Sequence, residues 1–100
     1  MNIYKLKNKL DTLKLNELFN VISNFVERRL IGINNLEVYK SKYLGYNIIG
    51  EGNNRRQVFL LTYFDDDSIL QINEIINEYH IFDILEDMFH EDIIIHQNED

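Results

Sequence analysis

The chain is 100 residues long, contains no cysteine, and carries a formal net charge of −7 at pH 7. The missing cysteines exclude disulfides, thiolate metal sites and a cysteine nucleophile. With 45% hydrophobic residues, we expect one globular domain over residues 1–100, with a frayed acidic tail at 97–100. No apolar run approaches the roughly 18 residues of a membrane helix, and no signal-peptide pattern is present. We therefore expect a soluble, cytoplasmic protein.

The charge is divided unevenly along the chain. Residues 1–56 hold all ten Lys and Arg residues and five acidic residues, which gives a net charge of +5. Residues 57–100 hold twelve acidic residues and neither Lys nor Arg, which gives −12. Such asymmetry indicates either a charged partner or two halves that complement each other within the fold or across a dimer.

Helical spacing dominates the first third of the chain. One apolar run at intervals of three and four residues predicts a helix over about 2–12. A second run predicts a helix over about 14–31, with arginines in its last turn and Gly32 as the residue after the cap. The two runs form either one helix or two, and Thr12 as an N-cap favours two. The apolar residues of the first run are Ile3, Leu6, Leu10 and Leu13.

Period-two alternation then replaces the helical period. Residues 36–48 and 57–64 read as the two strands of a β-hairpin, joined by a loop at 50–54 whose Gly and Asn residues suit positive φ angles. Lys40-Ser41-Lys42 interrupts the first strand as a bulge, a bend or a turn. The segment QVFLLTYF at 57–64 is apolar on both parities, which is typical of a strand that is central or covered on both faces.

The last third again has helical spacing. Asp67 or Ser68 is suited to cap a helix that begins near residue 68, with a kink or short break near His80-Ile81. Residues 93–95 form either the last helical turn or a short strand added to the sheet edge. The apolar face of the first part of this helix is Ile69, Ile72, Ile75, Ile76 and Tyr79.

These elements predict an α+β fold: an antiparallel β-hairpin of two or three strands, with the N-terminal and C-terminal helices packed on one face. A two-stranded sheet is marginal alone, so a third strand would come from 43–46, from 92–96 or from a partner chain. Pairing of sheet edges between two copies would give a symmetric dimer.

The sequence gives no sign of catalysis. The serines lie in no nucleophile motif, and Gly50-Glu51-Gly52 precedes a strand rather than the helix of a phosphate-binding loop. His80 and Asp83 have helical spacing but belong to no closed metal-ligand set. We expect no enzyme activity, no cofactor and no metal site.

The acidic C-terminal half suggests a binding function. Rows of carboxylates on a small rigid domain imitate a phosphate backbone and suit a basic cleft. Our first hypothesis is a non-catalytic protein that inhibits a basic partner, such as a nuclease or a nucleic-acid-binding complex, as an immunity protein or a phage-encoded anti-defence inhibitor would. The analogy with those inhibitors rests on size and charge alone. The partner-binding residues would be Asp66, Glu74, Glu78, Asp83, Glu86, Asp87, Glu91 and Asp92.

Two alternatives remain open. The first is a homodimeric nucleic-acid-binding regulator that uses basic residues of the hairpin, interleaved with tyrosines that would stack on bases. Its binding residues would be Lys40, Lys42, Arg55 and Arg56. The second is a structural module joined to a larger assembly by strand addition. Charge patterning alone does not separate a binding surface from a solvated helix face.

Overall fold

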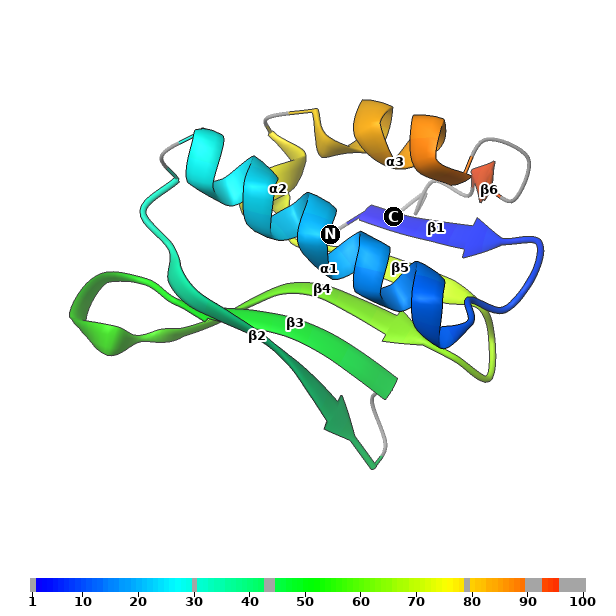
Figure 1. The fold of residues 1–100 in the computed structure, drawn as a ribbon, viewed down its shortest axis with the longest axis horizontal. Helices are drawn as coiled ribbons and strands as arrows, with labels where there is room; N and C mark the ends of the chain where they lie inside the picture. Colours follow the sequence, from blue (N-terminus) through cyan, green and yellow to red (C-terminus); the bar gives the residue numbers. More distant parts are fainter. Residues whose placement is uncertain (1, 30, 43–44, 79, 90–92, 96–100) are drawn as a thin grey trace.

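An antiparallel sheet with helices on one face forms the architecture in the computed structural model, which describes residues 2–29, 31–42, 45–78, 80–89 and 93–95 (Figure 1). The described residues form six strands in the order β2-β3-β4-β5-β1-β6. This confirms the α+β class and the antiparallel sheet, but the sheet has more strands than the two or three predicted. The elements are β1 (Asn2–Leu6), α1 (Thr12–Arg28), β2 (Asn34–Ser41), β3 (Gly45–Glu51), the 3-10 turn η1 (Asn53–Arg55), β4 (Gln57–Phe64), β5 (Ile69–Ile72), α2 (Glu74–Asn77), α3 (Ile81–Phe89) and β6 (Ile93–Ile95).

The predicted helix over 2–12 is wrong, because residues 2–6 form strand β1. β1 lies between β5 and β6, with Tyr4 opposite Leu70 on one side and Ile95 on the other. Pairing with two distant strands decides the outcome here, although the local apolar spacing also fits a helix. Helix α1 then starts at Thr12, and its N-cap is Asp11 rather than Thr12.

Helix α1 has the predicted amphipathic pattern. Its Asp11 cap accepts a hydrogen bond from the Lys14 backbone N–H at 2.8 Å. The helix ends at Arg28 with Arg29 as C-cap, so Gly32, with φ of 82°, lies beyond the cap rather than directly after it. The residues that it buries are Leu18, Ile22, Phe25 and Val26.

The central hairpin region is confirmed and contains one more strand than the simplest prediction. β2 ends at Ser41 and β3 begins at Gly45, so the interruption at 40–42 leads into a turn between two strands. The predicted loop at 50–54 joins β3 to β4. A bulge bends β4: Ile48 lies opposite Leu61 and Ile49 opposite Phe59, which leaves Leu60 as the extra residue.

The region after β4 differs from the prediction. Residues 65–68 form a turn rather than a helix cap, and 69–72 form strand β5, so the predicted helix start at Asp67 or Ser68 is wrong. The predicted break is confirmed, because α2 ends at Asn77, α3 begins at Ile81, and His80 has a φ of 62°. The strand alternative for 93–95 is also confirmed, since β6 pairs with β1. The predicted frayed tail at 97–100 lies outside the described residues.

One hydrophobic core lies between the helices and one face of the sheet. The pairing register puts Tyr4, Leu70 and Tyr63 in one row across three strands, all buried in this core. Tyr63 is only 1% exposed, and its hydroxyl accepts a hydrogen bond from the Leu10 backbone N–H at 2.9 Å. Because its hydroxyl has a hydrogen-bond partner, Tyr63 can be buried in the core without leaving a polar atom unpaired. The helices contribute Leu18, Ile22, Phe25, Val26, Ile76, Ile81, Leu85 and Phe89.

Replacing Leu70 by Ala tests the strand assignment of β5. Leu70 is fully buried, so we expect the free energy of unfolding to fall by about 2–5 kcal/mol. The predicted helix would instead have buried Ile69 and Ile72 and left Leu70 off its apolar face. Leu13→Ala is the control, because Leu13 is 68% exposed and should change stability by less than about 0.5 kcal/mol. Urea unfolding followed by circular dichroism measures both; equal effects would contradict the strand.

Candidate functional site

The acidic residues of α2 and α3 lie on the outside of the helix layer. In α3, Ile81, Leu85 and Phe89 recur every four residues and are buried, so the positions between them face solvent. The short helix α2 is fixed in the same way by the buried Ile76. We call the exposed carboxylates of the two helices the acidic surface: Glu74, Glu78, Asp83, Glu86 and Asp87.

Three predicted partner-binding residues are not part of this surface. Asp66 is exposed in the turn between β4 and β5, whereas α2 follows the opposite end of β5. The length of β5 therefore separates Asp66 from α2. Glu91 and Asp92 lie outside the described residues.

The basic residues of the alternative nucleic-acid site fall into two separate groups. Lys40 pairs with Tyr46 near the start of β3, and Arg55 and Arg56 follow its other end. β3 has seven residues, so at about 3.3 Å per residue the two groups are about 20 Å apart. The Lys40 ammonium lies 5.0 Å from the centre of the Tyr46 ring, a cation–π contact within the hairpin.

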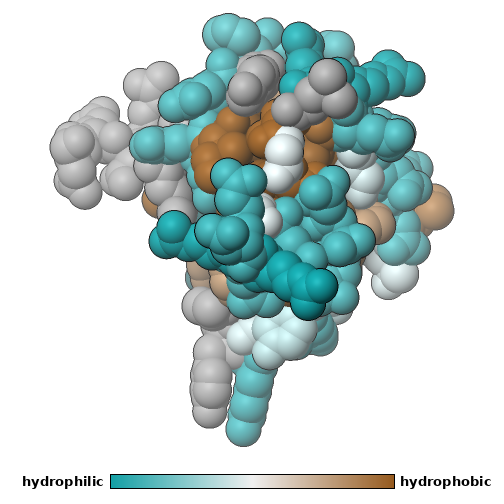
Figure 2. Space-filling view, turned by 90° about the vertical axis from the view of Figure 1, so that its left-hand side faces the viewer, coloured by the Kyte–Doolittle hydropathy of each residue, from teal (hydrophilic) through white to brown (hydrophobic). Residues whose placement is uncertain are grey.

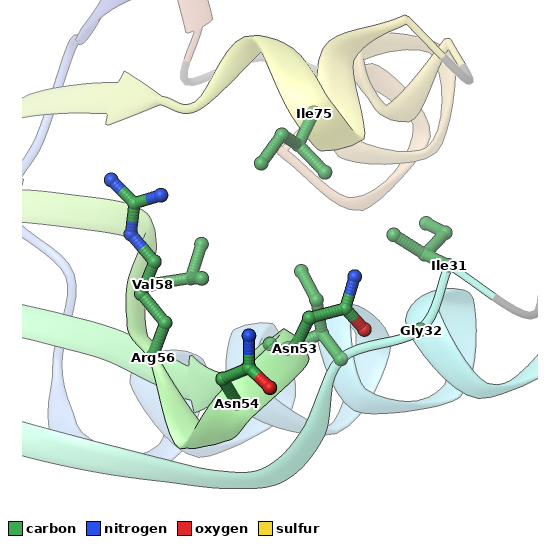
Figure 3. A pocket seen from close by; sticks show the side chains of 9 residues that line it. Ile31, Gly32, Asn53, Asn54, Arg56, Val58 and Ile75 are labelled. Atoms are coloured by element: carbon green, nitrogen blue, oxygen red, sulfur yellow. The ribbon is translucent and has the colours of Figure 1, made fainter.

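A cavity of about 450 Å³ opens beside the acidic surface. It lies between the β3–β4 loop, the segment that follows α1, and the first turn of α2. Figure 3 shows Ile75 on one side facing Asn53 and Asn54 on the other, with Ile31 at one end and Arg56 and Val58 along the opposite wall. Figure 2 views the molecule from this end and shows an apolar area bordered on several sides by hydrophilic residues. The lining residues are Ile31, Gly32, Ile33, Gly52, Asn53, Asn54, Arg56, Val58 and Ile75.

The loop that forms one rim of the cavity is closed by its own backbone. The Gly52 N–H donates to the Arg56 carbonyl at 2.8 Å, and the Arg56 N–H donates to the Asn53 carbonyl at 3.2 Å. Asn54 and Arg55 both have positive φ angles, of 60° and 57°. Asn adopts this left-handed region more readily than most residues, whereas Arg55 does so only with support, which the hydrogen bonds of the loop supply.

Asn73 positions Ile75 on the cavity wall. Its backbone N–H donates to the Leu60 carbonyl at 2.9 Å, and its Nδ2 donates to the Phe59 carbonyl at 2.8 Å. Its Oδ1 accepts a hydrogen bond from the Ile75 N–H at 2.9 Å, which caps α2. One side chain thus fastens the start of α2 to the bulge of β4.

Tyr4 joins the N-terminal strand to the end of α2. Its hydroxyl donates to Asn77 Oδ1 at 3.3 Å, across 73 residues of sequence. Burial raises the pKa of the Tyr4 phenol, because removal from water disfavours the phenolate. The hydroxyl therefore remains a donor to Asn77 throughout the physiological pH range.

Sequence reasoning identified the acidic residues of α2 and α3 but missed the cavity. Its walls come from three segments that the sequence does not relate to one another. The local signal was the pair Gly50 and Gly52, which we interpreted only as loop formers. A Cβ on Gly50 would lie 2.5 Å from Ile33 Cγ2, so this glycine also lets the segment that lines the cavity pack closely against β3.

Comparisons with known proteins give no relative. No protein-family model matches the chain, and neither a curated protein nor a solved structure matches it. Among the described residues, no helix combines the length and apolar character needed to span a bilayer. The described part of the chain also contains no group of three or more histidine or carboxylate side chains placed to hold a metal ion.

Replacing Asn73 by Ala should loosen the cavity wall. The substitution removes the cap on Ile75 and leaves the Phe59 carbonyl without its donor, so we expect a loss of about 1–3 kcal/mol of unfolding free energy. Amide hydrogen exchange of Ile75 and its neighbours should accelerate more than that of α1. Asn20→Ala, at an exposed position inside α1, is the control and should leave stability unchanged or slightly higher. Unchanged exchange at Ile75 would show that Asn73 does not hold α2.

Proposed function

We propose that the protein is a non-catalytic binding protein that docks on a basic partner protein through the acidic surface and the adjoining cavity. The observation that carries this proposal is their shared helix. Ile75 lines the cavity, while Glu74 of the same helix and Glu78, its C-cap, belong to the acidic surface. A partner that meets both would place an apolar side chain in the cavity and cations along the helices.

The two parts of this surface would supply different components of binding. Exposed carboxylates are worth little individually because water and salt screen them, but their summed field accelerates encounter with a basic surface. An apolar anchor that fills a cavity slows dissociation, since buried central side chains carry most of the affinity of an interface. The absence of Lys and Arg from residues 57–100 supports this division, since no cation of the sequence interrupts the acidic helices.

The partner class that fits is a nuclease or another nucleic-acid-binding complex. Such proteins have basic clefts that bind phosphates, and the carboxylates of α2 and α3 would occupy such a cleft in place of the phosphates. The protein would then act as an inhibitor, in the manner of an immunity protein or a phage-encoded anti-defence protein. Direct binding of nucleic acid is supported less well, because Lys40 and Arg56 lie at opposite ends of β3.

Charge reversal on α3 tests the electrostatic part. We expect Glu86→Lys with Asp87→Lys to reduce capture of the partner from the native host lysate at least tenfold at low salt. Glu17→Lys with Glu27→Lys changes the net charge equally on exposed positions of α1 and should leave capture unchanged. Quantitative mass spectrometry of proteins bound to each immobilised variant gives the comparison. Equal capture by all variants would contradict the proposal, as would a captured protein that is acidic.

Polar substitution at the cavity tests the apolar anchor. Ile75 is 39% exposed, so Ile75→Asn should fold, but it should raise the dissociation rate of the captured partner about 10- to 100-fold. The association rate should change little, because the charges are untouched. Leu13→Asn, at the more exposed apolar residue of α1, is the matched control. Surface plasmon resonance measures the association and dissociation rates separately. If Ile75→Asn slowed association and left dissociation unchanged, Ile75 would not be the apolar anchor.

A further inference from the structure

The sheet has a second face that no described helix covers. Because pairing partners in a sheet point to the same side, the register identifies this face residue by residue. Lys5, Ile69 and Phe64 form one row across β1, β5 and β4, and Glu37, Ile49 and Phe59 form another across β2, β3 and β4. The neighbouring row of Tyr4, Leu70 and Tyr63 lies in the core under the helices, so these two rows lie on the opposite side. We call this side the open face.

The open face is more apolar than a sheet face exposed to water should be. Phe59 is 43% exposed and Tyr39 is 52% exposed, while Phe64 and Ile69 are half-buried. The strand β4 explains the pattern, since its sequence is apolar on both parities, as expected for a strand covered on both faces. The helices cover one of those faces, so aromatic side chains of the other are left for a partner.

Two polar side chains at the centre of the open face, Asn47 and Thr62, are already paired within the sheet. Asn47 is fully buried, and its Oδ1 accepts a hydrogen bond from Thr62 Oγ1 at 2.7 Å. Its Nδ2 donates to the Tyr39 carbonyl at 3.4 Å. Covering this face would therefore leave the Asn47 amide with its partners, while Gln71, opposite Thr62 in the same row, would meet the occupant as a polar side chain.

The charges on either side of the central row indicate what that occupant is. Lys5 on β1 and Glu37 on β2 are separated by three intervening strands, or about 19 Å at the usual strand spacing, and lie in rows at opposite ends of the strands. Opposite charges in rows on either side of the centre make a surface that is complementary to itself. A two-fold axis in the plane of contact, perpendicular to the line that joins Lys5 to Glu37, would set each Lys5 over the Glu37 of the second copy.

We infer that the open face binds the same face of a second copy of this chain, forming a symmetric sheet-on-sheet dimer. Tyr39, Phe59, Phe64 and Ile69 supply its apolar contacts, and the two Lys5–Glu37 pairs fix its orientation. The acidic helices then point outwards on both sides, so the carboxylates of the two copies stay apart despite a net charge of −7 on each chain. This arrangement differs from the edge pairing predicted above, because no strand is added to the sheet.

The mass of the full chain in solution tests this dimer without any foreign partner. Sedimentation velocity of the wild-type protein should give twice the 12.0 kDa chain mass at micromolar concentration. Phe59→Asp should give a monomer. Val38→Asp is the matched control, because Val38 is 47% exposed on β2 but pairs with Ile48 on the helix side, and it should remain dimeric. A monomeric wild type would overturn the inference, as would a Val38→Asp variant that dissociates while Phe59→Asp does not.

A charge exchange tests the two-fold orientation and avoids folding problems, since both residues are exposed. Lys5→Glu and Glu37→Lys should each weaken the dimer at least tenfold, because each creates two like-charge pairs. The double variant should restore the dissociation constant to within about threefold of wild type. Single variants that dimerise as tightly as wild type, or a double variant no tighter than the singles, would overturn the arrangement. Circular dichroism of each variant confirms that the monomer is folded.

Discussion

The insertion of β1 between β5 and β6 is the constraint on which the structure depends. Five residues at the N-terminus pair on both sides with strands from the last third of the chain. The same five residues add Tyr4 and Leu6 to the core, and the Leu6 N–H donates to the Ser68 carbonyl at 2.7 Å. Without β1 the sheet would end at β5, and neither the C-terminal strand nor the far end of the core would have a surface to pack against. Bringing β1 next to strands from the last third of the chain costs conformational entropy. This cost rises only slowly with the length of chain between the strands, and the buried apolar area offsets it.

Local patterns predicted the parts of the fold that local interactions determine. The period of α1, the glycine-rich loop before β4 and the break at His80 were all recognisable. Strands β1 and β5 were not, because each is short and its spacing fits a helix equally well. For β1, the apolar residue Tyr4 lies off the helical face that contains Ile3 and Leu6. For β5, the run Asp65–Ser68 between two apolar segments also fits a turn. In both cases pairing with a distant strand decided between two locally acceptable structures.

The same distinction applies to the proposed binding surfaces. The exposed carboxylates of α3 follow from helical periodicity, since every fourth residue is buried. Asp66 was grouped with them because sequence distance does not show that β5 intervenes. The cavity needed the tertiary structure, because Ile31, Asn53 and Ile75 come from three separate segments. The open face needed the register: only the pairing of Phe64 with Ile69 and of Ile69 with Lys5 shows that these side chains share one side of the sheet.

Asn73 gives the molecule a physical link between its two sides. Its amide holds the carbonyl of Phe59, a residue of the open face, and caps the N–H of Ile75, a residue of the cavity wall. If both faces bind as proposed, a ligand that shifts this amide from one side would change the affinity on the other, and thermodynamic reciprocity would require the same factor in both directions. Asn73 would then couple the two proposed binding faces.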